Sequence, residues 1–215
     1  MFQKMSVLKE LPKNYQPMDQ FDLNENQGLA MILNLTGIGV LFGAGWLLLE
    51  SLAILRPDYL LDENILVISG LREFWRGVLL LVVTLGLMVV LNALGRAIIL
   101  WLVTKTSPQF GFQGMYKVTA TSEWYFSKRA YSLIRLLPMA IITLAGLIAI
   151  PLVPLNLVPG VLLLVSLNLA GGLGDVVTIY WLSRRPDDVL ILDVNEVVQV
   201  FHPDKGAQEI KQSDA

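Results

Sequence analysis

The chain has 215 residues, of which 54% are hydrophobic and 16% charged, and its formal net charge is -2. Soluble domains carry about a quarter charged residues, so this composition indicates an integral membrane protein. The slight negative net charge gives no support for nucleic-acid binding, which usually needs a basic face. The sequence holds no cysteine and a single histidine, His202. Disulfides, cysteine-based metal sites and multi-histidine sites within one chain are therefore excluded.

The first half of the chain contains two long apolar runs. Residues 1–28 are polar and lack the basic and then apolar pattern of a signal peptide, so we expect a cytoplasmic N-terminal tail. The run Leu29–Leu49 is uncharged and long enough to cross a hydrocarbon core, which takes roughly 20 residues. A second run, Gly77–Val103, is interrupted by Asn92 and Arg96. Both runs are predicted to span the membrane.

The uncharged stretch Leu136–Gly174 is too long for one span. As a single helix it would reach about 58 Å, nearly twice the thickness of the hydrocarbon core. Prolines interrupt helices, and three of them mark a reversal here: Pro151, Pro154 and Pro159. We therefore expect a third span at 131–150 and a fourth at 160–182. The membrane domain would then cover residues 29–182, followed by a cytoplasmic tail at 183–215.

The distribution of basic residues predicts the orientation. With the N-terminus inside, the external segments carry three basic residues: Arg56, Arg72 and Arg76. The internal segments carry twelve: Lys4, Lys9, Lys13, Lys105, Lys117, Lys128, Arg129, Arg135, Arg184, Arg185, Lys205 and Lys211. Because internal loops of membrane proteins are enriched in Lys and Arg, both termini are predicted to be cytoplasmic.

In two segments outside the spans, apolar and polar residues alternate, as they do in β-strands. Phe110–Thr121 alternates around glycines and predicts a cytoplasmic β-hairpin, in which Phe110, Phe112 and Tyr116 are candidate contacts for a partner. Val189–Asp193 and Val197–Phe201 flank a turn and predict a second, weaker strand pair.

The aromatic segment Trp124–Phe126, which precedes two basic residues, is typical of an anchor at the membrane interface. The predicted class is an all-α integral membrane protein with four transmembrane helices, a small hairpin and short tails.

Polar residues inside the spans are the candidate functional residues, because a polar group costs free energy at membrane depth. Asn92 and Arg96 lie four apart, and Asn168 and Asp175 lie seven apart, so each pair shares a helix face. Arg96 and Asp175 each lie seven residues before the cytoplasmic end of their span, which predicts a salt bridge between them. In the alternative interpretation, Arg96 extends to the interface and the asparagines only bond neighbouring helices.

Several short motifs occur in an order that resembles a bacterial membrane family of zincin peptidases, similar to site-2-type intramembrane proteases. They include the second span, Phe-Gly-Phe-x-Gly-x-Tyr at 110–116, Tyr125–Arg129 with Tyr131, Pro138, and Asn168–Asp175. Leu11–Tyr15, Asp193 and Phe201–Pro203 follow the same order. The resemblance covers nearly the whole chain and implies a multi-pass protein of the bacterial inner membrane.

The resemblance also implies that the catalytic motif is degenerate. The family carries His-Glu-x-x-His in its second span, with two zinc ligands and a general base. The matching positions here are Asn92, Ala93 and Arg96, so both imidazoles and the glutamate are replaced. Asp175 matches an acidic residue of the family's fourth span. These residues predict no catalytic group, metal or cofactor.

We therefore expect a catalytically inactive protein that lies in the lipid bilayer and binds or scaffolds a partner there. We do not expect it to bind a nucleic acid. One alternative is a structural subunit of a larger membrane complex. Another is a protease with an unfamiliar site, but the predicted spans contain no His, Lys or Glu to act as a base.

The orientation is open to a direct test. Reporters fused at Ala215 and within Phe110–Ser122 are expected to be cytoplasmic, and one inserted within Pro57–Asn64 is expected to be external, because of the asymmetry in basic residues. An external C-terminus would contradict the four-span topology.

Overall fold

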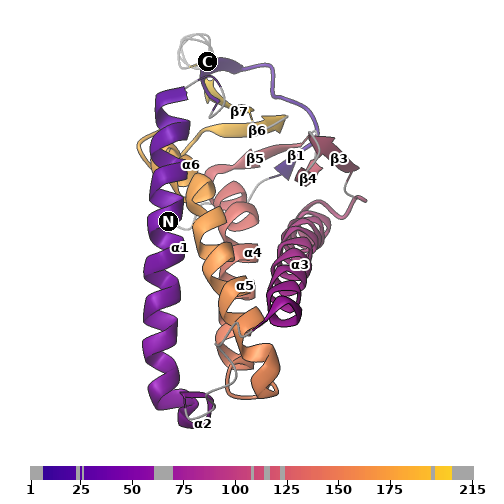
Figure 1. Ribbon diagram of the computed structural model, residues 1–215. Helices are drawn as coiled ribbons and strands as arrows, with labels where there is room; N and C mark the ends of the chain where they lie inside the picture. The colour runs from indigo at the N-terminus through magenta and orange to yellow at the C-terminus, as the bar shows by residue number, and fades with distance from the viewer. Residues whose placement is uncertain are drawn as a thin grey trace, which may run out of the picture. The chain divides into compact units, whose positions relative to one another are not determined.

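Four membrane-length helices dominate the computed structural model, which describes residues 7–22, 25, 27–60, 70–107, 109–113, 117–121, 124–194 and 197–204. In this part of the chain, the stretches long and apolar enough to cross a membrane are α1 (Gln27–Leu55), α3 (Leu71–Thr104), α4 (Lys128–Ala149) and Leu155–Ser183 (Figure 1). The expectation of four such helices is confirmed, and the chain is a multi-pass membrane protein.

The fourth stretch is divided into shorter helices. It comprises η1 (Leu155–Leu157), α5 (Val158–Gly171) and α6 (Leu173–Ser183). A proline occupies the first turn of α5, where a missing backbone N–H is tolerated. The short helix α2 (Pro57–Leu60) follows α1. The predicted reversal between the third and fourth spans therefore lies where the prolines place it.

The all-α class needs correction, because a five-stranded antiparallel sheet accompanies the helices. Its strand order is β1-β5-β6-β7-β2. The strands are β1 (Val7–Leu8), β2 (Tyr15–Phe21), β5 (Tyr125–Ser127), β6 (Leu190–Val194) and β7 (Val197–Pro203). The predicted strand pair in the C-terminal tail is confirmed as β6 and β7. The N-terminal segment, expected to be only a polar tail, contributes both β1 and β2.

A separate two-stranded sheet is formed by β3 (Gln109–Gln113) and β4 (Lys117–Thr121). Its register pairs Gln109 with Thr121 and Gln113 with Lys117. The predicted hairpin is thus confirmed in its strands. The side chains of Phe110 and Phe112, and the whole of Tyr116, lie outside the described residues.

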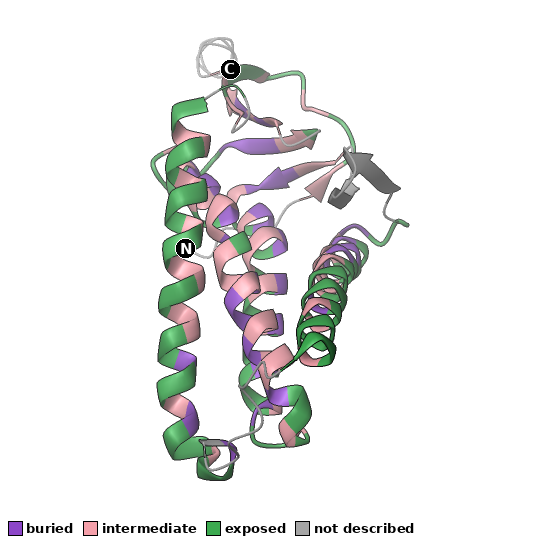
Figure 2. Ribbon diagram, viewed as in Figure 1, coloured by how far each residue is buried: buried purple, intermediate pink, exposed green. Residues whose placement is uncertain are grey.

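The chain divides into two compact units. The first, the sheet unit, consists of the described residues within 1–30, 95–136 and 174–215. Its core joins sheet residues such as Ile191 and Val200 to helix residues such as Tyr131 and Leu182. Figure 2 shows the buried residues on β5 and β6. Phe126 is only 2% exposed within this core, so its expected role as an interfacial anchor was wrong.

The second, the helical unit, comprises the described residues within 31–94 and 137–173. Its core consists of Leu48, Leu52, Tyr59, Ile150, Val158, Leu162 and Val165. Arg56, just after α1, donates from Nη1 to the backbone oxygens of Ile150 (3.2 Å) and Val153 (2.9 Å). It thereby ties the end of α1 to the turn that follows α4.

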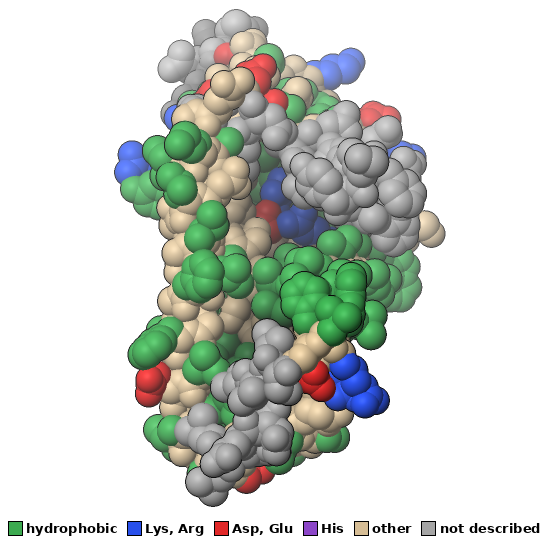
Figure 3. All heavy atoms as spheres, in the orientation of Figure 1, with side chains coloured by type: hydrophobic (Ala, Val, Ile, Leu, Met, Phe, Trp, Pro, Cys, Tyr) green, Lys and Arg blue, Asp and Glu red, His purple; other side chains and the backbone are tan. Residues whose placement is uncertain are grey.

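Helices α4 and α5 approach closely within this unit, because a Cβ on Gly146 would lie 2.3 Å from Cγ2 of Val165. The outer surface of α1 is hydrophobic (Figure 3), with Phe42 71% exposed. Such a surface is suited to contact with lipid chains.

Candidate functional site

Asp175 is the centre of an ion network in the sheet unit. It lies in the first turn of α6 and is 8% exposed. Its Oδ2 accepts a hydrogen bond from Arg96 Nη2 at 2.5 Å, and its Oδ1 accepts one from Arg135 Nη1 at 2.6 Å. The contact between Arg96 and Asp175 expected from their positions in the sequence is therefore present.

Arg135 extends the network from α4 to the sheet. Its Nη2 donates to Oδ2 of Asp193 at 2.6 Å, and the hydroxyl of Tyr131 donates to the same oxygen at 2.9 Å. The Arg135 guanidinium also lies 5.4 Å from the centre of the Tyr131 ring. The network thus connects α3, α6, α4 and β6.

The charges in this network balance. Two arginines face two aspartates, and three of the four side chains are at most 21% exposed, with Asp193 at 25%. Charge-assisted hydrogen bonds between a guanidinium and a carboxylate are strong, and the planar guanidinium can serve two acceptors, as Arg135 does. One donor remains: Arg96 Nε is buried and has no hydrogen-bond partner among the described residues.

Sequence reasoning did not include Tyr131, Arg135 and Asp193 in the site. Tyr131 and Arg135 lie four apart on α4, so they occupy one helix face. Arg135 also falls within 131–150, the range predicted for the third span, although the count of basic residues assigned it to the cytoplasmic side. That charge was the available signal. Asp193 has no such signal, because its place beside α4 depends on the pairing of β6 with β5.

The two asparagines belong to a second cluster, in the helical unit. Asn92 Nδ2 donates to Met88 O at 3.1 Å and to Asn168 Oδ1 at 3.3 Å. Asn168, 2% exposed, donates to Met139 O at 2.8 Å and to Thr143 Oγ1 at 2.9 Å. These bonds link α3, α4 and α5, as interhelical amides commonly do in membrane proteins.

Small residues accompany this cluster. A Cβ on Gly171 would lie 3.0 Å from Met88 Cε, and one on Gly172 would lie 2.0 Å from Met139 Sδ. Ala93, one residue after Asn92 on α3, is 6% exposed. The small residues Gly171, Gly172 and Ala93 allow the helices to approach closely.

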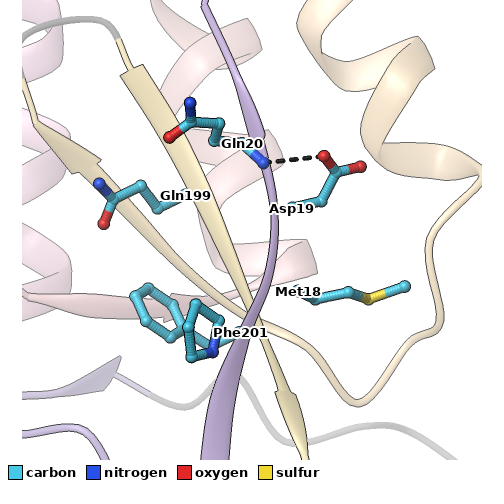
Figure 4. A pocket seen from close by; sticks show the side chains of 6 residues that line it. Met18, Asp19, Gln20, Gln199 and Phe201 are labelled. Atoms are coloured by element: carbon cyan, nitrogen blue, oxygen red, sulfur yellow. Dashed lines mark hydrogen bonds between the residues drawn. The ribbon is translucent and has the colours of Figure 1, made fainter.

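The single histidine lies in the sheet. His202 belongs to β7, and its Nε2 is 3.9 Å from Asp188 Oδ1. Nearby, β2 and β7 border a hollow of about 440 Å³ (Figure 4). It is lined by Pro17, Met18, Asp19, Gln20, Gln199 and Phe201. In Figure 4 the Asp19 carboxylate accepts a hydrogen bond from the backbone of Gln20, at 2.9 Å.

The ion network predicts a non-additive response to mutation. Arg96→Met leaves an excess negative charge and Asp175→Asn an excess positive charge in a buried site, so each is expected to cost roughly 3–5 kcal/mol. The double variant is neutral again and should recover much of the loss. Thermal unfolding in detergent measures all three.

Arg184→Met is the matched control, because Arg184 is exposed and exposed substitutions usually change stability by less than about 0.5 kcal/mol. The interpretation fails if Arg96→Met is as mild as Arg184→Met, or if the losses in the double variant simply add.

The family model described as "Putative zincin peptidase" matches residues 80–190, more than half of the 215-residue chain. This range holds Arg96, Arg135 and Asp175 and ends just before Asp193. No curated protein matches the chain, and no solved structure does. Because the match covers more than half of the chain, the chain belongs to the family that carries this description, "Putative zincin peptidase".

Proposed function

We propose that this chain is a non-hydrolytic member of its family, which binds or scaffolds another membrane protein. The observation that supports this most is the pairing of both Asp175 oxygens with guanidinium groups, one of them from Arg96. By resemblance, Arg96 takes the position of the second zinc-binding histidine. A permanent cation therefore occupies a position where the active proteins would hold a metal ligand.

The residues present do not fit a zinc ion. Zinc in proteins is bound by thiolate, imidazole and carboxylate groups, whereas the motif positions carry an amide, a methyl group and a guanidinium. The nearby carboxylate, Asp175, already accepts hydrogen bonds from two arginines. Within the described part of the chain, no three His, Cys, Asp or Glu side chains are grouped as metal ligands.

The general base is also replaced. A zincin uses a glutamate to activate water beside the metal, and Ala93, at that position, has no group that can accept a proton. It is also nearly fully buried. The motif positions of this chain therefore lack both the zinc ligands and the general base that the family's chemistry needs. Family membership alone does not transfer the activity.

For the binding role, the β3–β4 hairpin is the proposed contact surface. It forms a sheet of two strands, and a strand edge can pair with an extended segment of a partner through backbone hydrogen bonds. The orientation derived from the basic residues would place it on the cytoplasmic side of the inner membrane, together with both termini.

The alternative role, a fixed subunit of a larger membrane complex, is favoured by the same hairpin and differs in its partner. Mild detergent extraction from native membranes distinguishes the two: one partner in constant ratio supports a subunit, and several weakly held clients support a scaffold.

Because the zinc ligands and the general base are replaced, we expect the purified protein to bind no stoichiometric zinc. We also expect it to cleave no peptide bond of a membrane-spanning substrate. Elemental analysis after exposure to zinc, and cleavage assays in lipid, measure these two properties. As a matched comparison, Asn92→His/Ala93→Glu/Arg96→His introduces the missing ligands and base into the same chain. One tightly bound zinc per wild-type chain, or zinc-dependent cleavage by it, would contradict the proposal.

A further inference from the structure

A pocket in the helical unit has no part in the proposed function. It has a volume of about 420 Å³, within the range of roughly 300–1,000 Å³ that is common for small-molecule sites. Its lining is almost entirely apolar and comes from α1, α2 and α5: Leu41, Phe42, Gly45, Trp46, Leu49, Tyr59, Pro159, Leu162, Leu163 and Ser166.

Two buried hydroxyl groups are the polar exceptions. Tyr59 is 2% exposed and Ser166 is 3% exposed. Neither the Tyr59 hydroxyl nor Ser166 Oγ has a hydrogen-bond partner among the described residues. A buried hydroxyl without a partner is unfavourable, so native proteins rarely keep two of them at one site unless something else provides the acceptor.

The Tyr59 hydroxyl is protonated and can therefore donate a hydrogen bond. Burial raises the pKa of Tyr59 above its ordinary value of 10.0, so the phenol stays protonated at neutral pH. A serine hydroxyl is likewise a donor under all physiological conditions. The pocket therefore offers two donors within an apolar wall, which matches an apolar ligand that carries a hydrogen-bond acceptor.

The position of the pocket indicates the source of that ligand. Its residues lie on two membrane helices and on α2, and its rim includes Phe42 and Trp46, which are 71% and 66% exposed on α1. A lipid chain is the apolar group that surrounds such a surface in a bilayer. Tyr59 directly follows Asp58, whose partly exposed carboxylate pairs with Arg56 at 3.1 Å. This charged pair marks the polar boundary, and aromatic residues with a polar tip favour that level.

We propose that this pocket binds one ester-linked membrane lipid. An acyl chain fills the apolar part, and an ester carbonyl accepts hydrogen bonds from Tyr59 and Ser166. No bond is made or broken, so the lipid acts as a structural ligand of α1, α2 and α5. The proposal is independent of the catalytic state of the Arg96 site.

Glycines on α1 provide a matched pair of variants. A Cβ on Gly45 would lie 3.6 Å from Ser166 Oγ, whereas one on Gly43 would meet nothing within 4 Å. Gly45→Leu therefore fills the pocket, and Gly43→Leu adds the same side chain to the same helix outside it. A third variant, Tyr59→Phe/Ser166→Ala, removes both hydroxyls and keeps the shape of the pocket.

Native mass spectrometry of delipidated protein is the measurement. The protein is mixed with equal amounts of an ester-linked phosphatidylcholine and the ether-linked lipid of identical headgroup and chain length. Wild type and Gly43→Leu are expected to retain one lipid and to prefer the ester by about 2- to 10-fold, the effect of one net hydrogen bond. Gly45→Leu should lose this lipid.

The hydroxyl-free variant should bind the ester and the ether lipid equally. It tests the proposal even if Gly45→Leu disturbs the packing of α1, because it leaves the pocket open. Equal binding of the two lipids by wild type, an ester preference that persists without the hydroxyls, or a folded Gly45→Leu protein that retains its lipid would each overturn the proposal.

Discussion

The charge of Asp175 has to be compensated where it lies, and this constraint organises the sheet unit. A short carboxylate near the start of α6 cannot reach water through a long side chain as lysine or arginine can. Arg96 from α3 and Arg135 from α4 supply the compensation. Since Arg135 also pairs with Asp193 on β6, the same interaction joins the helices to the sheet.

This arrangement also determines what chemistry the site can support. In a zinc enzyme the metal ion neutralises its acidic ligand, and the histidines are neutral. Here the positive charge is delivered by arginines, which stay charged at all accessible pH values. A cation and a divalent metal compete for the same carboxylate, so a protein that uses Asp175 to hold two guanidinium groups is poorly suited to hold zinc there. The ion pairs of Arg96, Arg135, Asp175 and Asp193 balance their charges within the sheet unit.

Much of the helical part of the fold was predictable, because uncharged apolar runs of membrane length usually form transmembrane helices and prolines mark where these helices end. Arg96 and Asp175 could be paired from their equal distance to the ends of their spans. The sheet was harder to predict, since β2 contains Pro17 and no β-branched residue, and it pairs with β7, far away in the sequence. Asp193 and the buried position of Phe126 depend on that sheet. They become visible only when β5 and β6 are known to be neighbours.

We propose that Arg96 and Arg135 hold Asp175 in the place that a metal ion takes in active relatives. The most direct test is an experimental structure of the protein in a lipid environment, determined with zinc in excess. We expect both guanidinium groups to remain bonded to Asp175, and no ion to be coordinated by this carboxylate. A zinc ion bound to Asp175, with the Arg96 side chain turned away from it, would contradict the account.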